Sequence, residues 1–499
     1  MNKIRVNFSG FLAFISGLVS VSFGLVFSLV VVRKLSPESY GTWGLLFSIV
    51  SYLLISESII STWTTRQIAR GENIGKSGVL SSLMLSILIL PLFIGYAFLI
   101  SENSETKFEI LLLGIILIPV SFVSQTISAI NLGHSPHLVS LSQLIFQVVK
   151  IPIAIVTVII FHLDIFGVVL AMFIAFSVKI VFQVYFARDK LKDKFSFKRL
   201  KSWIKISWVP LFAQIPNYLT TIDVVLYSII TNSVIGIAYF QVAYSIAAIV
   251  QHSGTISQAL YPKLLATKSF EGIKKNLNHS LYFAILLIGI SIVFSKPALY
   301  ALNPIYQNGW PIVIALALKI FFQALRTIPS YVISGTEEVD TEHNPKFSKL
   351  LKSNLFKMPK FAIIFYSSYM LILVVFLSLF KNSGLSEVEI VTWWAIIGLL
   401  IEISYSIFLW SYSRKYTKII FPIKNLIKYI CGMSAFVIFF LLTSDLILNY
   451  KPSIYDFLPS LFVELILCVG IYIGITNLID KETRDLFRSI LIEIKLFKL

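Results

Sequence analysis

Two sets of polar and basic residues repeat one helical spacing, i, i+4 and i+7, inside long apolar runs. They are Gln143, Gln147 and Lys150 in the first set, and Lys319, Gln323 and Arg326 in the second. Residues at this spacing lie on one face of an α-helix. Arginine can hold a phosphate through two parallel hydrogen bonds, and lysine acts on it as a mobile point charge. Two such stripes therefore predict a cavity that binds an anionic headgroup.

A third cation, Lys179, is followed one turn later by Gln183 and joins the candidate residues. An ionisable side chain inside a membrane helix costs about 2.5–3.5 kcal/mol on insertion scales, so it usually faces a bundle interior or a water-filled cavity. Lys179 stands near the end of its apolar run, where snorkelling to the surface is an alternative. Lys150 and Arg326 are too central for that, and a buried ion pair is their alternative to a cavity.

Two carboxylates inside apolar runs are candidates for binding a coupling Na⁺ or H⁺. Asp223 shares a helical face with Thr220 and Tyr227, and Glu57 stands less centrally in its run. Pairing with one of the basic residues is an equal alternative, since either arrangement places the carboxylate in the bundle interior. We find no phosphate-binding glycine loop, metal-spaced His/Cys cluster or nucleophile elbow. No catalytic residue, resident cofactor or metal site is therefore expected.

Long apolar runs must position these side chains. The 499 residues are 57% hydrophobic and 13% charged, whereas about a quarter of the residues in a soluble domain are charged. A spanning helix needs about 20 mostly apolar residues, and fourteen runs qualify: 8–32, 40–62, 79–100, 110–131, 139–161, 166–187, 208–231, 235–260, 279–301, 311–334, 361–380, 389–411, 429–449 and 458–479. Barrel strands would be about ten residues long with alternating polarity. The sequence therefore predicts an all-α integral membrane protein.

Lys and Arg predict the orientation of these spans. With the N-terminus inside, the inner segments hold 32 of these residues and the outer loops hold five. Cytoplasmic loops carry such an excess, so we expect a multi-pass protein of the plasma (inner, cytoplasmic) membrane with both termini in the cytoplasm. These loops account for the net charge of +17, and no nucleic acid partner is expected.

The densest basic run, residues 188–207, holds eight of these cations and divides the chain. We expect an N-terminal lobe of helices 1–6 over 1–187, a C-terminal lobe of helices 7–12 over 208–411, and helices 13 and 14 with a cytoplasmic tail over 412–499. Helices 2 and 8 both open on a glycine, Gly41 and Gly236, which supports a pseudo-symmetric repeat. Repeated lobes with a site between them are a common transporter plan.

The segment after the first span carries a resemblance to a known family. Residues 32–44 read Val-Arg-Lys-Leu-Ser-Pro-Glu-Ser-Tyr-Gly-Thr-Trp-Gly. This resembles the R-x-L-G-P-E-x-[FY]-G-x-[WY] signature of the Wzx-like oligosaccharide-lipid flippases, with Ser36 in place of the usual glycine. These polysaccharide transporters belong to the multidrug/oligosaccharidyl-lipid/polysaccharide exporter (MOP) superfamily, which also includes the multidrug MATE exporters.

Further matches extend the resemblance along the chain. Residues 56–60 and 65–70 are similar to the family's D-x-G-[IL] and R-[EQ]-[IL]-A patterns, with Glu57 in place of the aspartate and Ile59 in place of the glycine. In the second half, three residues fall where the family has proline, aspartate and V-G-x-Y: Pro210, Asp223 and Gly236.

The resemblance implies a V-shaped, MATE-like transporter. It would move an oligosaccharide on a polyprenyl phosphate or pyrophosphate carrier from the cytoplasmic to the outer leaflet by alternating access, for surface polysaccharide or glycoprotein glycan assembly. Four cations would hold the phosphate and acidic sugars, and three glutamines would bond the glycan: Lys150, Lys319, Arg326 and Lys179, with Gln143, Gln147 and Gln323. A lipid-linked oligosaccharide and membrane lipids are then the ligands, and a glycan polymerase or glycosyltransferases are candidate partner proteins.

Three other functions compete with this one. An exporter of soluble small molecules on the same fold, coupled to a cation or a proton, is the main alternative. A glycosyltransferase that uses a polyprenyl-phosphate sugar is disfavoured, because Glu38 is the single carboxylate of the first outer loop, residues 33–39. A structural scaffold would not need central charges. We therefore expect a transporter and not an enzyme.

Overall fold

The computed structural model contains helices and loops, and no strand, in the residues that it describes: 6–104, 106–205, 207–257, 260, 264, 270, 272–335, 352–417, 421–451 and 453–496. Side chains are described within these ranges from Gly17 onward, except at 209, 355 and 489–496. The predicted all-α membrane class is confirmed.

The chain forms two compact units. We name residues 22–241 with 359–394 the N-terminal unit, and residues 1–21, 242–358 and 395–499 the C-terminal unit. The lobe boundaries predicted at 187/188, 207/208 and 411/412 stay predictions.

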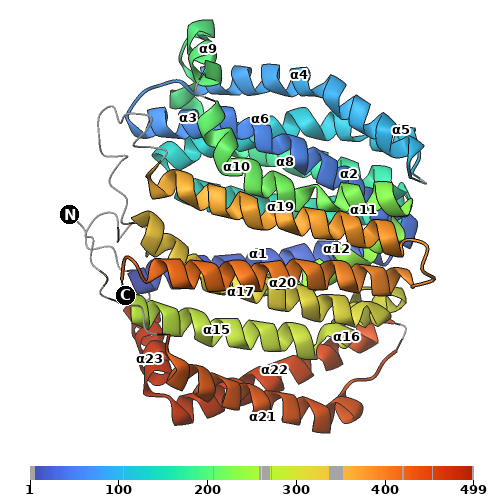
Figure 1. Cartoon of the computed structure of the whole chain (residues 1–499), viewed down its shortest axis with the longest axis vertical. Helices are drawn as coiled ribbons and strands as arrows, with labels where there is room; N and C mark the ends of the chain where they lie inside the picture. The colour runs from blue at the N-terminus through green and yellow to red at the C-terminus, as the bar shows by residue number, and fades with distance from the viewer. Residues whose placement is uncertain are drawn as a thin grey trace. The chain divides into compact units, whose positions relative to one another are not determined.

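The first half of the chain consists of helices joined by short turns. Figure 1 shows α6 packed along both α4 and α8. The α-helices up to residue 247 are α1 (Val6–Val32), α2 (Pro37–Leu54), α3 (Ser58–Ala69), α4 (Gly75–Glu102), α5 (Phe108–Leu111), α6 (Gly114–His134), α7 (His137–Ala154), α8 (Asp164–Ala187), α9 (Phe197–Lys205), α10 (Trp208–Thr221), α11 (Asp223–Thr231) and α12 (Ile235–Ala247). The tighter or wider turns among them are η1 (Ile55–Glu57), η2 (Ile155–Ile160) and η3 (Arg188–Leu191).

The second half of the chain also consists of helices joined by turns and loops. In the C-terminal unit, α15, α21 and α22 pack along one another (Figure 1). The remaining elements are η4 (Ala248–Gln251), α13 (His252–Thr255), α15 (Ile273–Val293), α16 (Ser295–Leu302), η5 (Pro304–Gly309), α17 (Trp310–Gly335), α19 (Asn354–Phe380), α20 (Glu387–Ser413), α21 (Ile423–Ile447), α22 (Ile454–Ile479) and α23 (Lys481–Leu496).

Twelve helical segments among the described residues are long and apolar enough to cross a membrane. They account for twelve of the fourteen predicted spans. The predicted span 8–32 is helix α1, whose part with described side chains, Gly17–Val32, is a shorter apolar helix. The predicted span 208–231 is divided into α10 and α11 at Ile222. The chain is therefore a multi-pass membrane protein whose helices follow the predicted apolar runs.

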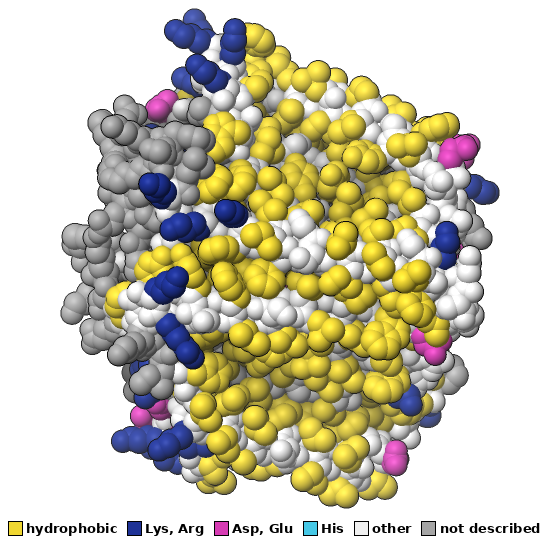
Figure 2. Space-filling view, in the orientation of Figure 1, with side chains coloured by type: hydrophobic (Ala, Val, Ile, Leu, Met, Phe, Trp, Pro, Cys, Tyr) yellow, Lys and Arg dark blue, Asp and Glu magenta, His cyan; other side chains and the backbone are white. Residues whose placement is uncertain are grey.

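Large apolar side chains cover the outward faces of these helices. Leu88, Leu371, Leu446 and Leu478 are each at least 69% exposed. Figure 2 shows apolar side chains over the middle of the helices, with Lys and Arg mostly gathered near the helix ends. In water such a surface would aggregate, whereas lipid is the solvent that it matches. Helices are favoured there because they satisfy every backbone polar group within one segment.

Two glycines of the family signature allow close helix packing. A Cβ atom at Gly41 of α2 would clash with the carbonyl oxygen of Val234, at the start of α12. A Cβ atom at Gly236 of α12 would clash with the hydroxyl of Tyr227 on α11. Glycine is required at both positions because no side chain fits into these contacts.

Candidate functional site

Lys150 is a buried cation in the N-terminal unit. It belongs to α7, and the residue is only 8% exposed. Its ammonium nitrogen lies 4.3 Å from the ring centroid of Phe27 and 5.3 Å from that of Phe146. Within the described part of the chain no carboxylate pairs with it. Aromatic faces attract a cation without neutralising it, so no described group balances the charge of this side chain.

The second cation of this unit, Lys179, joins a polar network between α7 and α8. Its ammonium donates to the Gln143 side-chain oxygen at 3.3 Å. One turn further along α8, the Gln183 amide donates to the hydroxyls of Ser142 at 2.7 Å and Ser128 at 3.1 Å. Lys179 is 8% exposed and Gln183 is fully buried. Lys179 is thus buried among polar groups in this structure, and its side chain does not extend to the surface.

The local geometry of α7 places its polar stripe next to a break in the helix. Pro152 interrupts the backbone hydrogen bonds, and the helix continues as the π-helical turn η2. Such wide turns are frequent at functional sites, and proline is a common cause of a bend. Gln147, on the same stripe, has a buried side-chain oxygen without a hydrogen-bond partner among the described residues. That oxygen is an acceptor available to a polar ligand.

Glu57 lies where the second span changes its helical geometry. The 3₁₀ turn η1 separates α2 from α3, and Glu57 ends that turn. The carboxylate is buried at 2% exposure and accepts a hydrogen bond from the hydroxyl of Thr126 on α6. Binding a proton would remove the cost of burying this charge, so the position is suited to holding one.

Asp223 is the centre of a buried aromatic cluster in the N-terminal unit. It begins α11, directly after the break at Ile222, and is 3% exposed. Its Oδ2 accepts from the hydroxyl of Tyr369 at 2.7 Å and from the indole nitrogen of Trp394 at 3.3 Å. The Trp394 ring is stacked on the ring of Tyr227, whose centroid lies 5.0 Å away. Two neutral donors thus orient this carboxylate within the unit.

The cations of the C-terminal unit have a different environment. On α17, the Arg326 guanidinium forms an ion pair with Glu402 of α20 and lies 4.8 Å from the ring centroid of Tyr405. The Gln323 amide donates to the same carboxylate at 3.3 Å. Glu402 is fully buried. Gln323 and Arg326 are therefore brought together on one carboxylate, which partly balances the charge of this stripe.

Lys319 lies one turn before Gln323 on α17. Its ammonium nitrogen lies against α20, where a Cβ atom at Gly398 would come within 3.1 Å of it. The glycine therefore leaves room for the lysine side chain between the two helices. All three residues of the second predicted stripe thus face α20 within this unit.

Several contacts of these sites were not singled out from the sequence. Ser128 and Ser142 line the Gln183 network, and Tyr369 and Trp394 hold Asp223. Serine and aromatic residues are frequent in apolar runs, so their types carry no signal. Glu402, in contrast, stands out in the sequence because it is a carboxylate inside an apolar run.

Comparisons with solved structures identify the fold. The fold is similar to an inward-facing multidrug resistance MATE family transporter of the MOP superfamily, with TM-score 0.60 and 14% identity over 81% of this chain and 99% of that chain. It is also similar to a MOP superfamily transporter from Pyrococcus furiosus, with TM-score 0.56 and 13% identity over 82% of this chain and 94% of that chain. A point mutant of a MATE protein gives TM-score 0.55 and 14% identity, over 83% of this chain and 97% of that chain.

No curated protein resembles the chain closely enough in sequence to count as a match. At this level of identity the solved structures establish the fold alone. The family model described as "Polysaccharide biosynthesis protein", in contrast, matches residues 9–268, which is more than half of the chain. The chain therefore belongs to the polysaccharide biosynthesis protein family and has the fold of the MOP superfamily transporters.

Proposed function

We propose that the protein flips a polyprenyl-phosphate- or pyrophosphate-linked oligosaccharide from the cytoplasmic to the outer leaflet by alternating access. The family membership supports a role in polysaccharide assembly, and the fold supports a membrane transporter. The glycan would then be used in surface polysaccharide or glycoprotein synthesis. Glycosyltransferases that build the glycan and a polymerase that uses it are the proposed partner proteins.

The observation that carries this proposal is the burial of Lys150 without a described carboxylate partner. The described contacts of this buried ammonium are aromatic rings, so its positive charge has no described counter-charge in a low-dielectric region. Such a charge is costly in the empty protein and is best compensated by an anion from outside the chain. The phosphate of a lipid carrier has the opposite charge and three or more acceptor oxygens, whereas a cationic drug would be repelled. The Pyrococcus furiosus relative is itself described as having a binding pocket of reverse polarity that suggests a different function.

Other residues extend the proposed substrate contacts. Lys179 would take up a phosphate or an acidic sugar by exchanging its hydrogen bond to Gln143. The released Gln143 amide and the unpartnered oxygen of Gln147 would then bond glycan hydroxyls. In the C-terminal unit, Lys319 and Arg326 would contact the substrate while Glu402 and Gln323 hold the guanidinium in place.

Coupling to an ion gradient is proposed for two carboxylates. Asp223 and Glu57 are buried, and the donors described above orient each of them. Uptake of a proton or Na⁺ by Asp223 would weaken or reorient its hydrogen bonds from Tyr369 and Trp394. That change would reach the junction of α10 and α11, where the span is already divided.

The experiment is carried out in a deletion strain complemented with the wild-type protein or with Lys150→Gln. Mass spectrometry identifies the lipid-linked oligosaccharides, and an impermeant reagent reports the leaflet in which each one lies. We expect one complete glycan-lipid to accumulate in the inner leaflet of the deletion strain. The wild-type protein should restore its outer-leaflet pool, and Lys150→Gln should restore little of it.

Each other result has a defined meaning. An unchanged lipid pool with intact surface glycans would refute flipping and favour an exporter of soluble small molecules. A truncated glycan would indicate an enzyme that acts on the lipid carrier. Full complementation by Lys150→Gln would remove this lysine from the proposed substrate site.

A further inference from the structure

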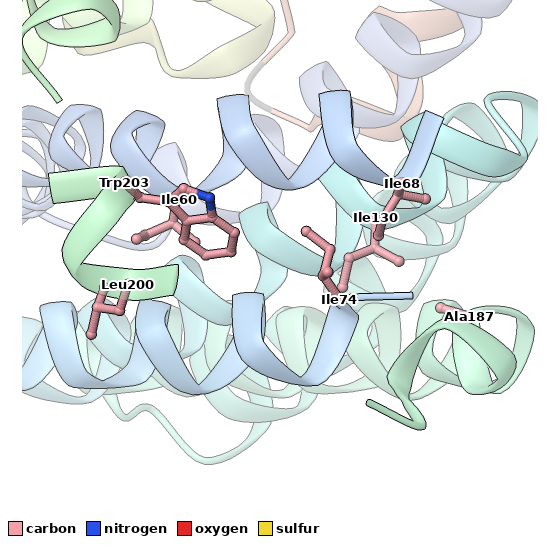
Figure 3. Packing of buried hydrophobic residues seen from close by; sticks show 7 residues of the cluster. All are labelled: Ile60, Ile68, Ile74, Ile130, Ala187, Leu200 and Trp203. Carbon is pink, nitrogen blue, oxygen red and sulfur yellow. The ribbon is translucent and has the colours of Figure 1, made fainter. Parts of the chain in front are cut away.

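The basic connector contains a short helix, α9, that is anchored at the end of the N-terminal unit's spans. Leu200 and Trp203 are buried on its inner face at 8% and 1% exposure. They pack in one cluster with residues of α3, the α3–α4 loop, α6 and α8 (Figure 3): Ile60, Ile68, Ile74, Ile130 and Ala187. Ala187 is the last residue of α8, so α9 lies level with the end of that span.

Polar contacts fix the same segment to the beginning of α4. The carboxylate of Asp193 accepts from the backbone nitrogens of Lys76 at 2.7 Å and Ser77 at 3.1 Å. These are among the first backbone N–H groups of α4, which have no partner within the helix. Arg199 of α9 lies 3.8 Å from the same carboxylate. The connector is thus held at the boundary of the spans by both apolar and polar contacts.

The outer face of α9 combines lysines with apolar side chains. Lys198, Lys201 and Lys205 stand at i, i+3 and i+7, which places them on one helical face, and all three are exposed. No hydrogen bond or ion pair of their ammonium groups is found among the described residues. Phe197 and Ile204, on the same short helix, are 68% and 56% exposed. Dark-blue side chains gather around this helix in Figure 2.

We propose that the outer face of α9 binds the headgroups of anionic phospholipids at the membrane surface. Charge complementarity argues for this occupant, because three lysines without carboxylate partners among the described residues face outward together. The apolar residues argue for lipid over a soluble anion, because an exposed phenylalanine and isoleucine fit the boundary between headgroups and acyl chains. The lysine stems can follow the acyl region while their ammonium groups stay at the phosphates.

The position of the helix agrees with this assignment. The last turn of α8 carries Tyr185 and Phe186, which are 62% and 44% exposed. The lipid-facing surface therefore continues to the level of α9, and the three lysines begin where that surface ends. Lipid binding by α9 is a contact of the protein with its own membrane and does not depend on the transported substrate.

The test uses the purified full chain in detergent, delipidated and titrated with phosphatidylglycerol or phosphatidylcholine. Native mass spectrometry gives the dissociation constant of the tightest bound lipid. A lysine near an anionic surface strengthens binding about five-fold, so K198Q/K201Q/K205Q should weaken phosphatidylglycerol binding by about a hundred-fold. Phosphatidylcholine binding should change little. A matched control, K107Q/K381Q/K451Q, removes three exposed lysines elsewhere and should leave both affinities unchanged.

A second variant tests the apolar part of the surface. F197S/I204S should weaken the binding of both lipids to a similar degree, because it removes contacts that do not depend on headgroup charge. The elution volume on size exclusion and the thermal unfolding temperature show whether each variant is folded.

Three results would overturn the proposal. The first is equal binding of both lipids by the wild-type protein, which would indicate that the outer face of α9 binds a protein partner instead of anionic lipid. The second is a triple α9 variant that retains its preference for phosphatidylglycerol. The third is an equal loss in the α9 and control variants, which would show a general effect of net charge without a site on α9.

Discussion

Replacement of Lys150 by methionine should stabilise the protein and impair transport. The side chain is buried, and its described partners are the rings of Phe27 and Phe146. Methionine has a similar length, fits irregular apolar spaces and carries no charge. The substitution therefore removes the charge while largely keeping the packing.

The expected gain in stability is the difference between two opposing free-energy contributions. A lysine at the centre of a membrane helix costs about 2.5–3.5 kcal/mol, and its attraction to aromatic faces offsets about 1–2 kcal/mol of this. Lys150→Met should therefore stabilise the protein by about 1–2 kcal/mol. At about 2 cal/mol/K of unfolding entropy per residue, the unfolding temperature of a chain this long should then rise by about 1 °C per kcal/mol.

The same substitution should impair transport. A hydrogen bond between charged groups contributes about 1.5–3 kcal/mol, so loss of the contact with phosphate should weaken substrate binding by about 10- to 150-fold. Thermal unfolding of the purified protein is followed by intrinsic fluorescence at one fixed scan rate. Transport is measured in proteoliposomes as the outward movement of the lipid-linked glycan.

One combination of results would refute this reasoning. If Lys150→Met lowered the unfolding temperature and retained normal transport, Lys150 would be a structural cation that is satisfied within the protein. Lys150→Arg keeps the charge with a bulkier group, and it serves as the control that separates charge from volume.

The remaining predictions concern other charged groups. Arg326→Met should destabilise the protein by about 3–5 kcal/mol, because it removes the ion-pair partner of the buried Glu402. The double variant with Glu402→Met should recover most of the unfolding temperature, and no recovery would argue against the pair. Asp223→Asn should reduce transport at least ten-fold and abolish its response to an imposed Na⁺ or proton gradient in proteoliposomes, whereas a retained response would exclude this residue from coupling. Burial of the Asp480 carboxylate raises its pKa, but hydrogen bonds that include one from Lys428 lower the pKa further, to below its ordinary value. The resulting stabilisation is present above about pH 4 and is lost as the pH falls through the lowered pKa, so thermal unfolding between pH 3 and pH 7 should show a smaller pH dependence for Asp480→Asn.

The sequence alone indicated which side chains deserve attention and missed how they pair. Lys150, Lys179, Asp223 and Glu57 stood out because ionisable groups are costly inside apolar runs. Their hydrogen-bond partners come from helices distant in the chain; Asp223 and Trp394, for example, are 171 residues apart. No local pattern encodes such a contact, because it depends on how whole helices pack.

The apolar runs by themselves determined the class of the protein and the positions of its spans. In lipid, each run must satisfy its own backbone hydrogen bonds, so a long apolar segment forms a helix whatever its neighbours are. The sequence could not separate two basic residues that share the same helical spacing and similar depth. The tertiary structure separated them: Glu402 reaches Arg326 from another helix, while Lys150 meets aromatic rings. Helix packing decides where a counter-charge lies, and so it decides which cation is balanced by a carboxylate of the chain.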